Sequence, residues 1–232
     1  MKTIRLARSL ILLASAALAP ATASAQVAWT DWLTLNAPAG TASGTMGGVT
    51  VNYVSAGPLS AAYTDCTTWP AADRWAVGNA YTNGTVSNRP ICDQLGISDA
   101  VTATVTFSSP VSNLYMAMLS VGRGGTPVTY TFNQSFVVDS WGFGFAGSDW
   151  NTGFGVTSGN SFTGEEFHGV LRFTSPVTTL TFTTNVPEHW QGFTFGAAPV
   201  PEPASASLTL VGAALLGAGA LSRCRTSVAV RT

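Results

Sequence analysis

The chain has 232 residues, of which 46% are hydrophobic, 10% aromatic and only 9% charged. A quarter charged is usual, and few charges together with many aromatic side chains exclude a disordered acidic or basic chain. Six of the ten basic residues lie in the two termini, whereas all 11 acidic residues lie between residues 26 and 203, so that middle region carries 4 − 11 = −7. A nucleic-acid surface needs clustered Lys and Arg, so no nucleic-acid partner is expected.

The N-terminal segment has the three parts of a secretory signal peptide. An apolar run at 10–18 follows a basic stretch, and small residues at 23–25 form a cleavage site. The basic residues are Lys2, Arg5 and Arg8. This pattern predicts that signal peptidase removes residues 1–25 by cutting after Ala25. The alternative is an N-terminal membrane anchor, although the apolar run is short for a span.

Residues 26–198 are predicted to form one all-β domain. In the segment 101–107 the odd positions are apolar and the even positions are Thr, which is the two-residue period of a half-buried strand. The same scheme recurs in four further runs, at 128–132, 171–173, 180–182 and 193–195. Many short strands with frequent turns are typical of an antiparallel β-sandwich or jelly roll. The one helical feature expected is a short turn within 71–77.

Two cysteines, Cys66 and Cys92, fall in the exported region. An even pair in an oxidising compartment predicts a disulfide, which would stabilise the fold by about 3–4 kcal/mol. We expect it to staple a long surface loop that holds Trp69, Trp75 and Tyr81. The alternative is two free thiols.

The segments 107–114 and 173–180 echo one another, since each runs Phe, three small residues ending in Pro, Val and then Leu three residues later. The spacing of 66 residues is too long for a solenoid repeat. We interpret the two segments as related corners of one sandwich, each a strand, a bend and the next strand. The alternative is a coincidence between similar units.

A glycine- and aromatic-rich segment follows. Trp141, Phe143 and Phe145 alternate with glycine, which indicates one core-facing side of a strand. Exposed aromatic rings beside polar side chains can stack on a sugar and bond its hydroxyls. The candidate glycan contacts are Asp149, Trp150, Asn151 and Trp190. A weaker alternative is calcium bound by Asp149, Asn151 and Glu165; no metal site and no cofactor are predicted.

No catalytic residues are predicted, because the common enzyme motifs are missing from the sequence. His168 and His189 are the only histidines, and neighbouring Glu165 and Glu166 would face opposite sides of a strand. Two carboxylates could hydrolyse a glycoside only if the fold brings them together across a cleft. The candidate pairs are Glu166 with Glu188, and Asp149 with Glu165.

Residues 199–232 are predicted to form a second targeting signal. Pro201, Glu202 and Pro203 precede an apolar stretch at 207–221, and Arg223 and Arg225 follow it. The run from 208 to 221 is about 21 Å long as a helix, a marginal membrane span with its basic end in the cytoplasm. This order resembles the PEP-CTERM sorting signal of exported bacterial proteins. The departures are that the basic cluster is thin and that the chain continues past it, from Thr226 to Thr232.

The resemblance implies that the Pro-Glu-Pro element is recognised by an exosortase, a membrane protease/transpeptidase, and that the tail is removed after transient anchoring in the inner membrane. The strand-rich middle is loosely similar to the ectodomains that precede such tails. We therefore expect a cell-surface or extracellular-matrix protein with a non-catalytic structural or adhesive role, in contact with exopolysaccharide. The alternatives are a carbohydrate-binding module and, less favoured, a secreted hydrolase.

Overall fold

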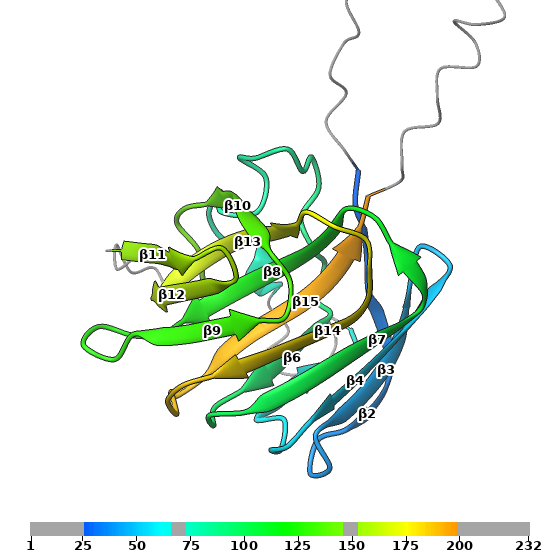
Figure 1. The fold of residues 1–232 in the computed structure, drawn as a ribbon, viewed down its shortest axis with the longest axis horizontal. Coiled ribbons are helices and arrows are strands. Elements are labelled where there is room, and N and C mark those ends of the chain that lie inside the picture. Colours follow the sequence, from blue (N-terminus) through cyan, green and yellow to red (C-terminus); the bar gives the residue numbers. More distant parts are fainter. Residues whose placement is uncertain (1–25, 66–72, 146–152, 199–232) are drawn as a thin grey trace, which may run out of the picture.

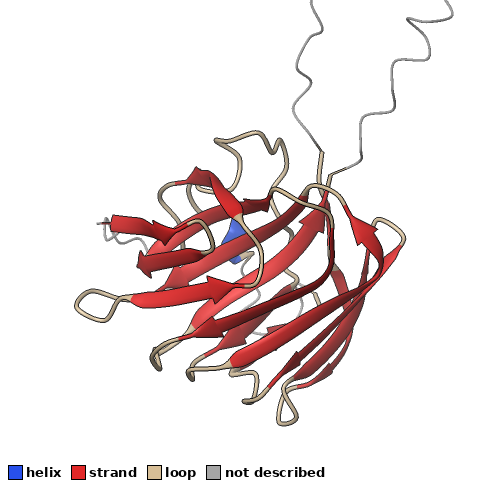
Figure 2. Ribbon diagram, in the orientation of Figure 1, coloured by secondary structure: helices blue, strands red, loops and turns tan. Residues whose placement is uncertain are grey.

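The computed structural model describes residues 26–65, 73–145 and 153–198, and these form an all-β fold of two antiparallel sheets. Figures 1 and 2 show the two sheets and the connections between them. The one helical element among the described residues is the 3-10 turn η1 (Arg74–Ala76), which lies inside the predicted segment 71–77.

The larger sheet has eight strands. Their order is β11 (Gly153–Ser158), β12 (Ser161–Glu165), β9 (Val128–Phe132), β14 (Val177–Thr184), β7 (Thr102–Val111), β4 (Val49–Ser55), β3 (Thr41–Met46) and β2 (Asp31–Asn36). The seven-stranded sheet has the order β10 (Phe136–Trp141), β13 (Phe167–Phe173), β8 (Leu114–Val121), β15 (Gln191–Ala197), β6 (Gln94–Ile97) and β5 (Ala61–Tyr63), and β1 (Ala28–Trp29) pairs with β15.

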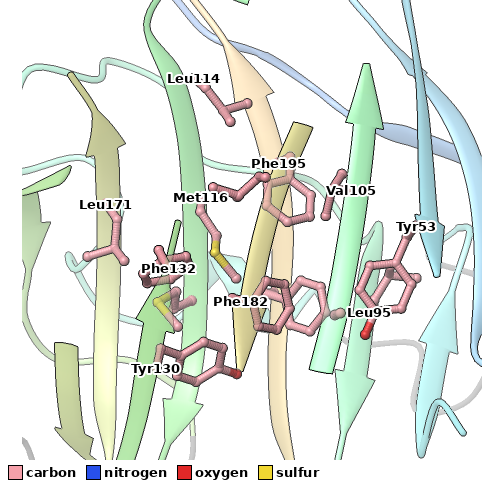
Figure 3. Close-up of a cluster of buried hydrophobic side chains, with 14 of the residues drawn as sticks. Tyr53, Leu95, Val105, Leu114, Met116, Tyr130, Phe132, Leu171, Phe182 and Phe195 are labelled. Atoms are coloured by element: carbon pink, nitrogen blue, oxygen red, sulfur yellow. The ribbon is translucent and has the colours of Figure 1, made fainter. Parts of the chain in front are cut away.

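The two sheets share one apolar core, because the inward positions of both contribute to a single buried cluster. Rings from different sheets meet there: Tyr53 on β4 lies 5.6 Å from Phe193 on β15, centroid to centroid, and Phe107 on β7 lies 6.4 Å from Phe195. Figure 3 shows how rings and aliphatic chains fill the space between the strands. Each large side chain buried in this way stabilises the fold by about 1.5–3 kcal/mol. The period-two interpretation of 101–107 is confirmed, since Val101, Ala103, Val105 and Phe107 are all buried.

The expectation of a surface loop around Trp75 and Tyr81 is wrong. Both side chains are almost fully buried, and they pack edge to face with centroids 5.0 Å apart. They belong to a second apolar cluster, which also contains Tyr115, Leu119 and Val170 from the outer face of the seven-stranded sheet. The irregular segment 73–93 thus covers a sheet face that would otherwise meet water.

The two echoing segments do form corners between the sheets. In the first, β7 of the eight-stranded sheet leads through a turn at Asn113 into β8 of the other sheet. In the second, β13 leads through a proline bend into β14, so the chain crosses in the opposite direction. The first copy differs in detail, because its strand continues to Val111, past Pro110.

The predicted core face at Trp141 and Phe143 is not observed. Strand β10 ends at Trp141, and the register shift between Val138 and Ser140 alters which side chains face inward. Trp141 is 48% exposed and Phe143 40% exposed, whereas Phe145 packs at the edge of the second cluster.

Several predicted features lie outside the described residues. They are the signal peptide at 1–25, Cys66, Trp69, the candidate glycan contacts Asp149, Trp150 and Asn151, and the sorting tail at 199–232. Within the described ranges, no helix has the length and apolar character needed to cross a bilayer.

Candidate functional site

The outer side of the eight-stranded sheet carries hydroxyl groups in rows. Its outward positions on six strands are mostly Thr, Ser or Asn, because the alternate residues point into the core; Val54, Pro110 and Glu165 are exceptions. We call these residues the hydroxyl face: Thr41, Ser43, Thr45, Thr50, Asn52, Thr102, Thr104, Thr106, Ser108, Thr129, Thr131, Ser161, Thr163, Thr179, Thr181 and Thr183.

Strand register aligns these side chains across the sheet. Thr163 lies opposite Thr129, Ser161 opposite Thr131, and Thr131 opposite Thr183. Some neighbours bond one another, with 2.9 Å between the hydroxyl oxygens of Thr129 and Thr163 and 3.3 Å between those of Thr131 and Ser161. Adjacent strands are about 4.8 Å apart and alternate residues about 6.7 Å apart, so the hydroxyls form a regular two-dimensional array.

The hydroxyl face is free of charge. The acidic side chains nearest to it by register are at its limits: Asp31 on edge strand β2 and Glu165 at the last residue of β12. Each hydroxyl offers one donor and two acceptors, as a sugar hydroxyl does. The face can therefore exchange hydrogen bonds with a polyhydroxylated polymer without stripping water from ions, although each bond contributes little alone.

A second feature lies on the other side of the molecule, around Arg74. Its guanidinium carbon lies 4.6 Å from the ring centroid of Trp190, 5.0 Å from that of Tyr63 and 5.1 Å from that of Phe145. The Arg74 Nη2 also donates to the Tyr63 hydroxyl at 3.4 Å. We call Arg74 and these three rings the arginine cage.

Trp190, a predicted glycan contact, is half-buried in this cage. Its indole lies over two bare stretches of backbone: a Cβ on Gly96 would approach Nε1 to 2.7 Å, and one on Gly192 would approach the six-membered ring at 3.2 Å. The other predicted glycan contacts lie outside the described residues, and the glycan role of Trp190 stays a prediction.

Glu188 is the most buried carboxylate of the described residues that sequence reasoning had singled out, at 7% exposed. Burial raises the pKa of Glu188 to about 7, and the nearby charge of Glu166 adds to the effect while Arg123 opposes it. The carboxylate of Glu166 accepts a hydrogen bond from the Ser120 hydroxyl at 2.8 Å. The fold therefore brings Glu166 and Glu188 within electrostatic reach, which is one of the two carboxylate pairs considered from sequence.

Glu188 also borders a set of polar atoms inside the core. Glu188 and Tyr53 both act electrostatically on the hydroxyl of Tyr130, and burial raises the pKa of Tyr130 well above its usual value. The hydroxyls of Tyr53 and Tyr130 lie toward the same end of the core (Figure 3). Gln191, at the start of β15, is fully buried.

His168 occupies the interior rather than a surface cleft. It is 1% exposed, and the backbone N–H of Ser120 donates to its Nδ1 at 3.2 Å. The ring lies against Gly144, where a Cβ would come within 2.3 Å of it. Burial lowers the pKa of His168 to about 4, so the imidazole is neutral at physiological pH. His189, by contrast, is exposed.

The remaining predicted residues are less informative. The Glu165 carboxylate accepts a hydrogen bond from the Gly125 amide at 2.6 Å, and its candidate partners for calcium or catalysis lie in the segment 146–152. In the part of the chain that the structure describes, no three His, Cys, Asp or Glu residues are grouped to hold a metal ion. Cys92 is 9% exposed, and its pairing with Cys66 stays a prediction because Cys66 lies outside the described residues.

Sequence reasoning missed the arginine cage. Tyr63, Arg74 and Trp190 are separated by 11 and 116 positions, and no periodicity relates them. It also missed the hydroxyl face as a surface, although the Thr-x-Thr runs that form it were the signal used for the strands. Comparison with family models, with curated proteins and with solved structures found no match to this chain.

Proposed function

We propose that this chain is an exported protein of the PEP-CTERM type whose mature domain, residues 26–198, serves as a non-catalytic structural or adhesive component of the cell surface or extracellular polysaccharide matrix. The domain would be a β-sandwich of the jelly-roll kind, freed from a cleaved signal helix and from a C-terminal transmembrane sorting helix. The sequence resemblance of the tail supports the route of export.

The hydroxyl face carries the adhesive part of this proposal. It presents many weak donors and acceptors in a regular array, without charges that would demand a specific counter-ion. Single hydrogen bonds contribute about 1 kcal/mol or less, but a polymer engages many of them at once, so its avidity exceeds that of any one contact. A repetitive polyhydroxylated chain is the partner that matches such a surface.

The test places two carboxylates on the face, as Thr106→Glu with Thr131→Glu. Both positions are exposed, so the fold should remain intact. A polymer that binds over the two carboxylates would have to remove their hydration, which costs free energy. We expect retention of the purified protein on polysaccharide from the producing cell to fall about threefold or more. Co-sedimentation measures it.

The matched control carries the same two charges elsewhere, as Thr82→Glu with Ala100→Glu, both at exposed positions outside the hydroxyl face. The control should be retained on the polysaccharide as strongly as the wild type. The melting temperatures of both variants should stay close to that of the wild type. Equal retention of all three proteins would show that the hydroxyl face does not contact the polymer and would remove the basis of the proposal.

A further inference from the structure

Among the described residues, the arginine cage leaves several N–H donors of Arg74 unused. A guanidinium has five N–H groups in one plane, and the hydrogen bond from this side chain within the described residues goes to the Tyr63 hydroxyl. The adjacent acid, Asp73, is engaged elsewhere: Arg89 binds its Oδ2 at 2.5 Å, and the Trp75 amide donates to its Oδ1 at 3.1 Å.

Within the described part of the chain, ion pairs join Arg89 to Asp73 and Arg172 to Asp139, and neither of them involves Arg74. Arg74 is half-exposed, so part of its side chain reaches solvent while its guanidinium lies against the three rings. A cation positioned over aromatic faces in this way is stabilised by their quadrupoles and is already fixed in one geometry.

The rings themselves are held in place. Trp190 rests on the backbone of β6 and β15, because Gly96 and Gly192 leave no side chain beneath it. Tyr63 belongs to β5, which pairs with β6, and Arg74 lies in η1, whose Trp75 is buried in the second apolar cluster. Four side chains from four parts of the chain are thus fixed by packing rather than by the ligand.

From this geometry we infer that the arginine cage binds a carboxylate-bearing sugar, a uronic-acid residue of an acidic polysaccharide. The planar fork of Arg74 matches a carboxylate with two parallel N–H···O bonds. The parts of Tyr63, Phe145 and Trp190 that stay exposed offer apolar surface beside the guanidinium for C–H groups of the same pyranose. The inference rests on the proposed function, since such polymers are met outside the cell, and it adds the chemical class of the partner.

The domain's charge shapes the expected behaviour. The region 26–203 carries a net −7, so long-range electrostatics does not draw an acidic polymer to it. Recognition must come from the short-range contacts of Arg74 and its rings, and the affinity for a short oligomer should be weak and local.

The test measures binding of an oligogalacturonate to the purified extracellular protein by calorimetry, beside a galactan oligomer of the same length that lacks carboxylates. Wild type should bind the uronic-acid oligomer more tightly than the neutral one, because a short neutral oligomer can engage only the hydroxyl face and makes few weak bonds there at once. Arg74→Gln should lower the affinity roughly tenfold or more, because the charge-assisted pair is lost. Arg74→Lys should also bind weakly, since an ammonium keeps the charge but has neither the planar fork nor the stacking surface.

Arg123→Gln is the matched control, because it removes the same charge from an exposed turn. It should bind like the wild type. In case the Arg74 variants unfold, NMR of the wild type gives an independent readout: the Nε–H signal of Arg74 should shift on titration with oligogalacturonate and stay in place with galactan.

Three results would overturn the inference. They are undiminished binding by folded Arg74→Gln, an unmoved Arg74 signal at saturating oligogalacturonate, and equal binding of poly-glutamate, which would make a carboxylate alone sufficient. A failure here with the hydroxyl-face result intact leaves the adhesive proposal standing. In the reverse case, the hydroxyl-face variant is retained like the wild type while Arg74→Gln loses affinity. That result removes the adhesive proposal for the hydroxyl face and leaves the binding of uronic acid by Arg74 supported.

Discussion

At the scale of single residues, burial shifts the pKa values of several ionisable groups in the direction that favours their neutral forms. The pKa of Glu188 and that of Asp93 are both raised to about 7, and in each case loss of hydration is the largest cause. The pKa of His168 is lowered to about 4 for the same reason, so its contribution to stability is lost as pH falls from 6.5 toward 4. These groups act in opposite directions on the pH dependence of folding.

Glu188 allows a test of this balance. A carboxyl whose folded pKa is raised stabilises the fold fully below its unfolded pKa of 4.5, and that stability is lost as pH rises through about 7. Glu188→Gln replaces it with a neutral amide of the same shape. We expect the variant to be more stable than wild type at pH 8, by up to about 3 kcal/mol, and close to it at pH 4.5.

Urea denaturation at both pH values measures this difference. Asp93 should leave a residual fall in stability with pH in the variant, since its pKa is raised in the same way. The control is Asp99→Asn at an exposed position, which should match the wild type at both pH values. Equal destabilisation of Glu188→Gln at pH 4.5 and pH 8 would mean that the carboxylate makes contacts that the fold requires.

At the scale of elements, the irregular segment 73–93 makes close backbone contacts with the loop after β10. Gly78 has φ +78°, and the Phe143 carbonyl oxygen accepts from the amides of Asn79 at 3.1 Å and Ala80 at 3.3 Å. A Cβ on Gly78 would lie 1.9 Å from that oxygen. The contact connects the segment to the loop after β10, from which Phe145 reaches the arginine cage.

Gly78→Ala should therefore lower the free energy of unfolding by more than the cost of placing an alanine in a left-handed backbone conformation. Gly125 is a matched control, because it has the same φ of +78° and nothing within 4 Å of the added Cβ. We expect Gly125→Ala to cost about 1 kcal/mol, and Gly78→Ala about 2 kcal/mol more, as the two backbones are pushed apart. Urea denaturation of both variants measures the two losses of stability. Equal losses would show that the segment 73–93 moves away from Phe143 without a cost in free energy.

At the scale of the whole molecule, the described chain begins and ends side by side. Strand β1 pairs with β15, with Ala28 opposite Ala197 and Trp29 opposite Gly196. Two further bonds fix the beginning, as the Asn88 side chain accepts from the Val27 amide at 2.7 Å and donates to its carbonyl at 2.8 Å. The predicted cleavage points, after Ala25 and near Pro201, are thus close in sequence to two strands that lie side by side.

Intact-mass measurement of the extracellular protein tests the proposed export. The mass should correspond to a chain that begins at Gln26, lacks the apolar run 208–221, and is two hydrogens lighter through the predicted disulfide. Pro201→Ala with Pro203→Ala should leave a longer form in the inner membrane, whereas Pro110→Ala, outside the tail, should be processed normally. A soluble cytosolic protein with both ends intact would contradict export.

Sequence by itself determined the all-β class, the positions of the strands at 101–107, 128–132 and 193–195, and the two corner units. It could do so because strand periodicity and proline bends are local: each side chain's orientation follows from its neighbours in the chain. The same Thr-x-Thr pattern implied the hydroxyl face once the strands were placed side by side. The candidate signals at both ends are likewise read from contiguous residues.

Only the tertiary structure decided which distant residues meet. It buried Trp75 and Tyr81, exposed Trp141 through a register shift, brought Glu188 near Glu166, and assembled the arginine cage. These outcomes depend on strand order, on which segment covers which sheet face, and on where glycine admits a close approach. None of these is encoded at a fixed spacing, because the energy that selects them comes from burial shared across the whole core.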